Sequence, residues 1–479
     1  MESNKKFTHS VLLITCTNLI RFMANIAVTL IIPNILGKSD YGNYKTYTLY
    51  ITYLVIFNFG LIEGIYLKYG GQDYDNLNKE KFRTYTRFLF VLEVIISLIV
   101  FFICNLFLEG DIKIVLTFLS LNILSVEFTT YFQRISQVTS KFSKQGIFDL
   151  FYSLSILIIV GIVYFFHISS YKIYLTMITI MNYLILIWYI VNYWNIVKGK
   201  ATGFKNEKNE ILKLMSLGIP LMLANFASEF ILNMDRQVVN IFFSKEDYAT
   251  YAFSYNFLNV INVLIQAISL VLYPFLKKMD INNIKKNYSN SNSMMLIIVY
   301  FCLIAYFPLT KIINWLLPTY VDSIKILKII FPISVFTSSI TVIKHNYYKV
   351  LEKNNIYFVK TIIMLVISLI ANFVSYFIFK TMESISIASI ITMFLWYIDT
   401  EIYLIKHYKI YYLKNLVYLC LMLLIYYICV CIFSNIYMGF FIYGLLFFLI
   451  SYILFPNLIK ESLKKIFTIH KKDENNIEH

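Results

Sequence analysis

The chain has 479 residues, of which 59% are hydrophobic and 14% are charged, with a mean hydropathy of +0.68 and a formal net charge of +15. Soluble globular proteins carry about 25% charged residues, and the deficit here extends along the whole chain, which excludes a soluble domain of any size. The positive net charge suggests a nucleic-acid partner, but the placement of the cationic residues along the chain argues against one.

Apolar runs of about 20 residues recur along the sequence, and each is long enough to cross a bilayer as a helix. The runs are continuously apolar and do not alternate, which excludes a transmembrane barrel. The predicted fold class is therefore an all-α integral membrane protein with about 14 transmembrane helices. The expected spans cover residues 10–36, 44–69, 86–108, 112–133, 145–167, 170–197, 212–243, 250–276, 293–316, 324–349, 358–380, 384–406, 413–434 and 437–459.

Lysine and arginine residues alternate between the two sides of this layout. With the N-terminus placed in the cytoplasm, the cytoplasmic segments contain 31 of the 42 Lys and Arg residues and the outer segments contain nine, while Arg21 and Arg236 fall inside spans. This alternation follows the positive-inside rule, and a missed helix would invert every segment after it. We therefore expect both termini in the cytoplasm and no nucleic-acid partner.

An internal repeat relates the two halves of the chain. The pattern K-x-D-Y-x-x-Y occurs at Lys38–Tyr44, after the first span, and again at Lys245–Tyr251, after the seventh, at an offset of 207 residues. Six spans separate the two copies, so the halves share one orientation in the membrane. The expected domains are an N-terminal six-helix bundle (1–197), a cytoplasmic linker (198–211), a C-terminal six-helix bundle (212–406), and two additional transmembrane helices with a basic cytoplasmic tail (407–479).

Motifs for catalysis and metal binding are not found in the sequence. Gly37-Lys38-Ser39 has the form of a P-loop ending, but that motif needs a glycine where the chain has Ile32. No H-E-x-x-H or G-x-S-x-G pattern occurs, the six histidines do not cluster, and the six cysteines lie within spans as small hydrophobic residues. We predict no enzyme activity, no catalytic residue, no metal site and no cofactor.

Polar residues follow one face of several spans at helical spacing. A charged side chain at the bilayer centre costs about 2.5–3.5 kcal/mol, so these faces are expected to meet protein or water and not lipid. The stripes comprise Thr15, Asn18, Arg21, Asn25 and Thr29 in the first span; Asn225, Glu229, Asn233, Arg236 and Asn240 in the seventh, with Asp235 beside them; Tyr255, Asn259, Asn262 and Gln266 in the eighth; and Ser334, Ser338, Thr341, His345 and Tyr348 in the tenth.

Two interpretations of the stripes stay open. Ser, Thr and Asn can hydrogen-bond across tight helix contacts, at about 0.6 kcal/mol each, and this needs no ligand. Arg21 and Arg236 instead place one cation on equivalent helices of the two bundles, as a central anion-binding cavity requires. The remaining acidic residues are interpreted as isolated groups (Glu93, Glu127, Asp149) or as snorkelling or paired groups near cytoplasmic ends (Glu63 with Lys68 near it, Asp149, Asp399 and Glu401).

Four segments of the chain resemble polysaccharide flippases, the Wzx/PST branch of the multidrug/oligosaccharidyl-lipid/polysaccharide exporter superfamily. Two match the opening of that family, and two match its second-half opening and its Asp-Arg pair. The segments are Asn18–Arg21, Ile31–Tyr44, Leu217–Leu221 and Asn233–Gln237. The second half departs from the pattern at Ala249, where the first half has Gly42.

The resemblance implies a MATE-like fold in a bacterial cytoplasmic membrane, with two six-helix bundles around a central cavity plus two extra C-terminal helices. It implies a flippase that moves a polyprenyl-pyrophosphate-linked oligosaccharide, such as an O-antigen unit of lipopolysaccharide or a capsule unit, to the outer leaflet by alternating access. Membrane lipid, a polysaccharide polymerase and chain-length proteins are the further partners that it implies. The alternative is an ion-coupled multidrug or metabolite exporter of the same fold.

The substrate would need a cationic site for pyrophosphate and a polar, aromatic surface for sugar. Arg21 and Arg236 are the candidates for pyrophosphate. The candidates for the sugar are Asn18, Asn25, Asn225, Asn233, Tyr255, Asn259, Gln266 and His345. The sequence leaves open whether Na⁺ or H⁺ is the counter-ion, and Glu229 and Asp235 are the ion-coupling candidates.

Overall fold

The computed structural model describes residues 2–139, 141–277, 279–408, 413–433, 435–458 and 460, and the side chains of residues 2–16, 18, 142 and 143 and of most residues between 262 and 281 lie outside this description. All regular elements of the described residues are helices, which confirms the expected all-α class. Contacts divide the chain into two compact units: a first unit, Met1–Val263 with Asn354–Ala388, and a second unit, Leu264–Lys353 with Ser389–His479.

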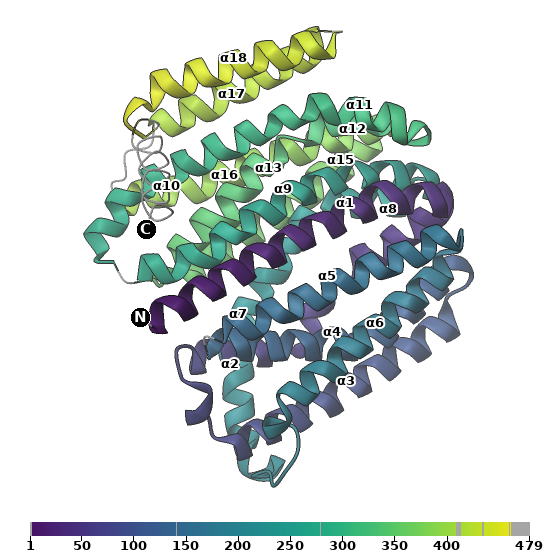
Figure 1. Ribbon diagram of the computed structural model, residues 1–479, viewed down its shortest axis with the longest axis vertical. Coiled ribbons are helices and arrows are strands. Elements are labelled where there is room, and N and C mark those ends of the chain that lie inside the picture. The colour runs from purple at the N-terminus through teal and green to yellow at the C-terminus, as the bar shows by residue number, and fades with distance from the viewer. Residues whose placement is uncertain are drawn as a thin grey trace, which may run out of the picture. The chain divides into compact units, whose positions relative to one another are not determined.

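The first unit contains the N-terminal helices, among which α1 packs along α5 (Figure 1). Its helices are α1 (Glu2–Ile51), η1 (Leu54–Asn58), α2 (Leu61–Tyr69), η2 (Tyr74–Asn76), α3 (Lys79–Phe107), α4 (Gly110–Val138), α5 (Phe142–Phe165), α6 (Tyr171–Asn192), η3 (Trp194–Ile196), α7 (Phe204–Leu232), α8 (Met234–Phe242), most of α9 (Lys245–Lys277), α15 (Asn354–Phe379) and the start of α16 (Met382–Tyr408).

The second unit contains the rest of α9 and α16 and a set of shorter elements. These are α10 (Ile281–Cys302), η4 (Leu303–Ala305), α11 (Tyr306–Leu316), η5 (Pro318–Tyr320), α12 (Ser323–Ile330), α13 (Ile333–Ser338), the π-helical segment η6 (Ser339–Lys344), α14 (His345–Val350), α17 (Leu413–Ile432) and α18 (Ile436–Leu454). The expected tail beyond the last span lies almost entirely outside the described residues.

The number of spans differs from the expectation. Among the described residues, eleven helices are long and apolar enough to cross a membrane, or twelve if the bent pair Ser323–Ile330 and Ile333–Val350 forms one span. The expected count of about 14 is therefore not confirmed. The division into bundles at residues 1–197 and 212–406 stays a prediction.

The largest local difference lies at the second expected span, 44–69, which is not one continuous helix. At the end of the first expected span, α1 is kinked at Gly37, whose backbone leaves helical geometry (φ 72°, ψ 167°) and joins two helical segments. A further break lies between α1 and α2, where Phe59 (φ 46°) and Gly60 (φ 77°) both adopt left-handed conformations. Hydropathy did not reveal this break, because the residues around it are as apolar as those of a continuous span.

Glycines bring α2 and α7 into direct backbone contact. A Cβ atom on Gly218 would lie 1.9 Å from the carbonyl oxygen of Gly60, and one on Gly64 would lie 1.9 Å from that of Leu214. No side chain fits at either position, so the two helices cross at the closest distance that a backbone allows, as small residues permit in membrane bundles. The broken span is therefore held against α7 at its break.

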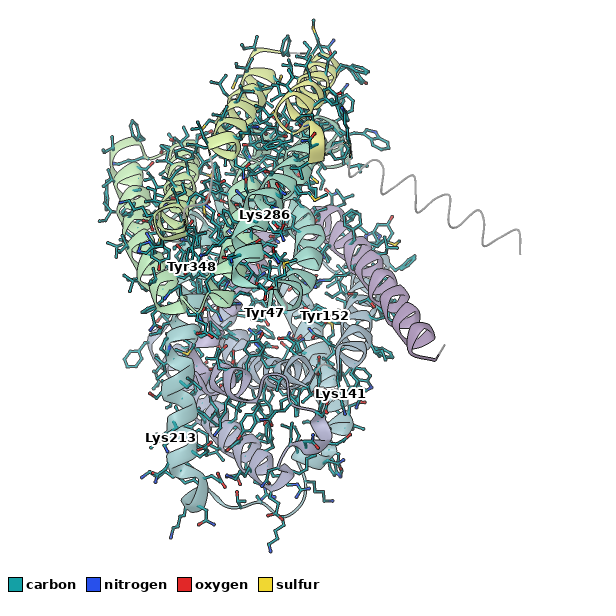
Figure 2. All side chains as sticks on the ribbon, turned by 90° about the vertical axis from the view of Figure 1, so that its left-hand side faces the viewer. Tyr47, Lys141, Tyr152, Lys213, Lys286 and Tyr348 are labelled. Carbon is teal, nitrogen blue, oxygen red and sulfur yellow. The ribbon has the colours of Figure 1, made fainter. Side chains whose placement is uncertain are left out.

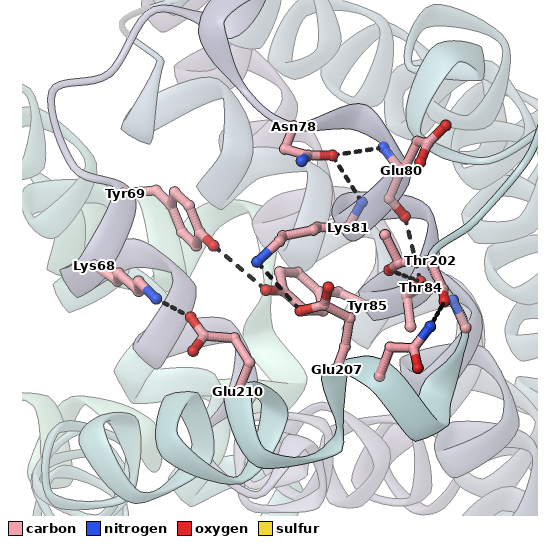
Figure 3. A network of polar contacts seen from close by, with 12 residues as sticks. Lys68, Tyr69, Asn78, Glu80, Lys81, Thr84, Tyr85, Thr202, Glu207 and Glu210 are labelled. Carbon is pink, nitrogen blue, oxygen red and sulfur yellow. Dashed lines mark hydrogen bonds and ion pairs between the residues drawn. The ribbon is translucent and has the colours of Figure 1, made fainter.

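The linker after α6 is fastened to the ends of α2, α3 and α7 by the polar network in Figure 3. Lys68 pairs with Glu210, and Lys81 Nζ lies 3.5 Å from a carboxylate oxygen of Glu207. The linker itself is held by arginines of α3: Arg83 donates to the carbonyl oxygens of residues 195 and 200, and Arg87 donates to that of residue 199. These bonds fix the linker to the first unit.

Candidate functional site

A polar cluster in the first unit forms where α8 meets α9. Asp235 is buried, and its Oδ2 accepts hydrogen bonds from the hydroxyls of Tyr251 (2.8 Å) and Tyr255. Its Oδ1 accepts from the backbone N–H of Arg236 at 2.7 Å. Ser386 donates to the Tyr251 hydroxyl at 3.2 Å, which directs the tyrosine proton toward the carboxylate. The carboxylate of Asp235 is therefore occupied by uncharged donors.

The neighbouring Arg236 points elsewhere and is half-buried. Its guanidinium lies 4.3 Å from the centroid of the Tyr255 ring, and one Nη donates to the carbonyl oxygen of Leu232 at 3.0 Å. Its Nε is buried without a hydrogen-bond partner. None of the four ion pairs among the described residues involves Arg236. Tyr255 thus supports the cation from one side while the cation keeps donor capacity for a ligand.

The two copies of the repeated motif cross in this region. Asn256 of α9 donates to the hydroxyl of Tyr41 at 2.7 Å, and the hydroxyl of Tyr248 donates to the carbonyl oxygen of Lys45 at 3.2 Å. Lys45 Nζ donates to Oδ1 of Asn256 at 2.7 Å and lies 5.3 Å from the Tyr41 ring centroid. The positive charge of Arg236 acts on Lys45. The cluster therefore holds two basic side chains, and none of the ion pairs found among the described residues involves either of them.

Two titratable side chains of the first unit lie within the field of its arginines and are exposed. Tyr152 of α5 exposes 42% of its surface and lies in the field of Arg21, whereas Glu229 of α7 lies in the field of Arg236. Tyr47 and Tyr152 lie near each other in Figure 2, and the hydroxyl of Tyr47 is buried without a hydrogen-bond partner.

Arg21 is placed differently from Arg236. It lies on an exposed part of α1, and its charge acts on Asp149 and Tyr152 of α5. The described contacts include no hydrogen bond, ion pair or ring contact between Arg21 and Arg236. The structure thus brings Arg236 together with Lys45, a cation that the sequence stripes did not include.

The predicted sugar-binding residues do not form one cluster among the described residues. Asn25 and Asn233 donate to carbonyl oxygens of their own helices, at 2.9 and 2.8 Å, while Asn225 is half-buried and Asn259 is exposed. Tyr255 belongs to the Asp235 cluster. His345 lies in the second unit, and the side chains of Asn18 and Gln266, like those of Thr15 and Asn262 in the same stripes, lie outside the described residues.

The second unit contains a buried ion pair that sequence reasoning missed. Lys344, at the end of the π-helical segment, is 0% exposed, and its Nζ lies 3.0 Å from Oε2 of Glu401, which is 1% exposed. The hydroxyl of Tyr288 donates to the same oxygen at 2.6 Å. Glu401 was expected to be a snorkelling or paired group near the end of a span. It is paired, but its side chain is buried and does not reach the surface. A π-helical turn, which often marks a functional site, rotates Lys344 into the core.

Three acidic residues were also interpreted wrongly. Glu93 and Glu127 are not isolated, because α3 and α4 pack against each other and the charge of Glu93 acts on Glu127. Glu63 does not pair with Lys68, which contacts Glu210 instead, and both carboxylate oxygens of Glu63 are buried without a hydrogen-bond partner. Glu93 and Glu127 lie at similar distances along the chain from the loop between α3 and α4. The sequence therefore did contain a signal that the two could meet across a helical hairpin.

One protein family matches the chain. The sequence pattern of the family described as "Polysaccharide biosynthesis protein" matches residues 7–280, more than half of the chain. No curated protein sequence matches the chain.

Solved structures share the fold over most of the chain. The lipid II flippase MurJ in an inward closed conformation is similar with a TM-score of 0.66 and 15% identity, covering 94% of this chain and all of that one. An outward-facing multidrug resistance MATE family transporter of the MOP superfamily is similar with a TM-score of 0.60 and 11% identity, covering 82% of this chain and 94% of that one. A MOP superfamily transporter from Pyrococcus furiosus is similar with a TM-score of 0.56, 12% identity and the same coverage.

Proposed function

This chain belongs to the polysaccharide biosynthesis protein family, and on that premise we propose that it is a flippase of the bacterial cytoplasmic membrane. Its substrate is an oligosaccharide carried on a polyprenyl pyrophosphate, moved from the cytoplasmic to the outer leaflet by alternating access of its bundles. The fold likeness to a structure described as a lipid II flippase supports the same class of substrate.

The observation that carries the proposal is the state of Arg236. A half-buried guanidinium is stabilised by an anionic partner, and here the adjacent carboxylate of Asp235 is occupied by Tyr251 and Tyr255, while Glu229 lies in the field of Arg236 without an ion pair. The buried Nε of Arg236 has no hydrogen-bond partner. Phosphate oxygens accept from a guanidinium in a forked geometry, which suits the free donors.

Lys45 and the aromatic side chains supply the rest of the proposed binding surface. Lys45 adds a second basic side chain, whose amine can donate a hydrogen bond to an anionic ligand. Tyr53 lies 5.1 Å from Phe230 and 5.9 Å from Phe226 between ring centroids, and flat aromatic faces with nearby hydroxyls suit sugar rings. Moving about two negative charges outward gains roughly 4–5 kcal/mol at about 100 mV, inside negative.

The test replaces the cations in the host cell and measures surface polysaccharide. Arg236→Ala is expected to reduce export by about tenfold or more, since hydrogen bonds to charged groups contribute about 1.5–3 kcal/mol. Arg236→Lys should restore part of it, because lysine keeps the charge and loses the fork. Lys325→Ala is the matched control, because Lys325 lies in an exposed pair with Asp322. Membrane accumulation of each variant is measured alongside, and normal export by an Arg21→Ala, Arg236→Ala double variant overturns the proposal.

A cation exporter of the same fold is the second candidate, and the exposed carboxylate of Glu229 favours it. A carboxylate within the field of Arg236 can attract a cationic drug once the arginine is engaged elsewhere. The two candidates separate on one comparison. If Glu229→Gln lowers tolerance to a cationic dye while Arg236→Ala leaves surface polysaccharide intact, the exporter is favoured and the flippase is rejected.

A further inference from the structure

Three carboxyl groups meet inside the first unit, away from the Arg236 cluster. Glu63 of α2 is 1% exposed, Glu93 of α3 is 0% exposed and Glu127 of α4 is 2% exposed. Glu127 lies in the electrostatic field of the other two, so the three groups form one interacting cluster. Negative charges on all three buried carboxyl groups would repel one another strongly, because the protein interior has a low dielectric constant.

Asn58 is the amide side chain that acts on the cluster, on both Glu127 and Glu63. Asn58 donates its Nδ2–H to Oε2 of Glu127 at 3.1 Å, and its Oδ1 accepts from the N–H of Gly60 at 2.9 Å, which fixes the orientation of the amide. Both carboxylate oxygens of Glu63 and both of Glu93 are buried without a hydrogen-bond partner. An unpaired ionised carboxylate in such a site costs on the order of several kcal/mol. The neutral, protonated acid is therefore the stable form of Glu63 and Glu93.

The charged groups that act on the cluster are few. Arg134 of α4 acts on Glu63, but its guanidinium donates to Oε1 of Gln137 at 3.0 Å and makes no ion pair with Glu63 among the described residues. Two acidic residues of α7, which packs against α2, have their own lysine partners: Glu207 lies beside Lys81, and Glu210 pairs with Lys68. One cation near three acids allows one of them to ionise at a time, while the others keep their protons.

The cluster does not have the geometry of a metal site. The described residues contain no group of three His, Cys, Asp or Glu side chains close enough to hold one metal ion. The ligand that remains for a buried carboxyl group without partners is a proton. The chemistry of the site is accordingly a simple exchange, in which a carboxyl O–H bond breaks, the proton passes to water and the carboxylate stays beside Arg134.

The site lies at the break of the second span. Asn58 ends η1, and the next two residues, Phe59 and Gly60, are the left-handed pair that separates η1 from α2. The backbone of Gly60 is in direct contact with Gly218 of α7. A charge that appears on Glu127 or Glu63 would draw donors toward it, and the closest donor, Asn58, is attached to the break itself.

We propose that Glu63, Glu93 and Glu127, together with Asn58, form a proton-binding site whose occupancy is linked to the geometry of the broken span. Its role as the coupling site of transport rests on the proposed function, whereas proton binding does not. The predicted coupling candidates Glu229 and Asp235 lie in a different cluster, where Asp235 already accepts three hydrogen bonds.

Infrared difference spectroscopy of the purified protein in liposomes tests the site without any substrate. We expect an absorption band from the carbonyl stretch of protonated carboxyl groups at neutral pH. This band should disappear when the sample is titrated to alkaline pH. Glu63→Gln and Glu93→Gln should each remove part of this band, and they should fold because glutamine resembles the protonated acid. Glu210→Gln is the matched control, since its carboxylate is ion-paired with Lys68 at the linker, and it should leave the band unchanged.

Two outcomes overturn the inference. A wild-type spectrum without a protonated-carboxyl band at neutral pH shows that the acids are ionised, and this result does not depend on any variant folding. A band that is unchanged in both Gln variants shows that its source lies elsewhere. The proposed function fails separately: if Arg21→Ala, Arg236→Ala exports normally while the band behaves as expected, the flippase is rejected and the proton site stands.

Discussion

The buried ion pair of the second unit makes a quantitative prediction about stability. Lys344 and Glu401 lie on η6 and α16, and both are fully enclosed. Lys344 Nζ donates to the carbonyl oxygen of Tyr397 at 2.5 Å and to Thr400 Oγ1 at 3.3 Å, so three acceptors surround the ammonium group. We consider the variants Lys344→Met and Glu401→Gln and the double variant that combines them.

The magnitudes follow from what each change leaves behind. Either single change leaves one buried charge without its counter-charge, which costs about 3–5 kcal/mol. The double change removes both charges, and the hydroxyl of Tyr288 can still donate to the amide oxygen at position 401. We expect the double variant to lie within roughly 1.5 kcal/mol of the wild type, because replacing a whole buried pair is often neutral. The coupling energy of the cycle is then at least about 4.5 kcal/mol.

The assay is reversible unfolding in mixed micelles, with the four proteins compared under one condition. Lys325→Ala is the control, because Lys325 and Asp322 form a pair in which both side chains are more than two-thirds exposed, and such pairs contribute about 0–1 kcal/mol. If the double variant loses as much unfolding free energy as the two single variants together, the result would falsify the reasoning. It would show that the two charges do not stabilise each other. A cost below about 1 kcal/mol for each single variant would have the same meaning.

Three further predictions concern the first unit. Gly218→Ala should push α2 and α7 apart and lower the unfolding temperature, whereas Gly161→Ala, with no atom within 4 Å of its new Cβ, should not; equal effects would contradict the backbone contact. Arg83→Ala with Arg87→Ala should release the linker and speed its cleavage by a protease, compared with Lys325→Ala, and unchanged cleavage would show that the arginines do not hold it. A reporter inserted within residues 198–210 should be cytoplasmic, and an external signal would reverse the orientation.

Helix positions were predictable from hydropathy because each span is an apolar run bounded by polar residues. The expected span 413–434 corresponds to Leu413–Ile432, and 112–133 corresponds to Gly110–Val138. The break near Gly60 was not predictable in this way, because it interrupts no apolar run. It depends on a left-handed backbone at Phe59 and on a glycine contact with a helix more than 150 residues later in the chain.

The candidate site was predictable only in part. The spacing of Asp235 and Arg236 on a helix indicated that the two side chains point in different directions, because neighbouring residues are about 100° apart. The hydroxyls that occupy Asp235 come from another helix, and Lys45 comes from a third, so no pattern within one segment indicates them. The buried position of Lys344 depends on a local π-helical turn, which periodicity at 3.6 residues per turn cannot represent.

The departure of the second repeat at Ala249 has a steric explanation in the crossing of the two copies. A Cβ atom on Gly42 would lie 2.3 Å from the carbonyl oxygen of Lys245, so the first copy requires glycine where the second copy passes over it. Ala249 is buried, and its side chain is accommodated, because the crossing is not symmetric about the two motifs. Tyr41 accepts from a side chain of α9, whereas Tyr248 donates to a backbone carbonyl of α1. The two copies of the motif therefore contribute different groups to one contact, and this contact lies where Lys45 is in the field of Arg236.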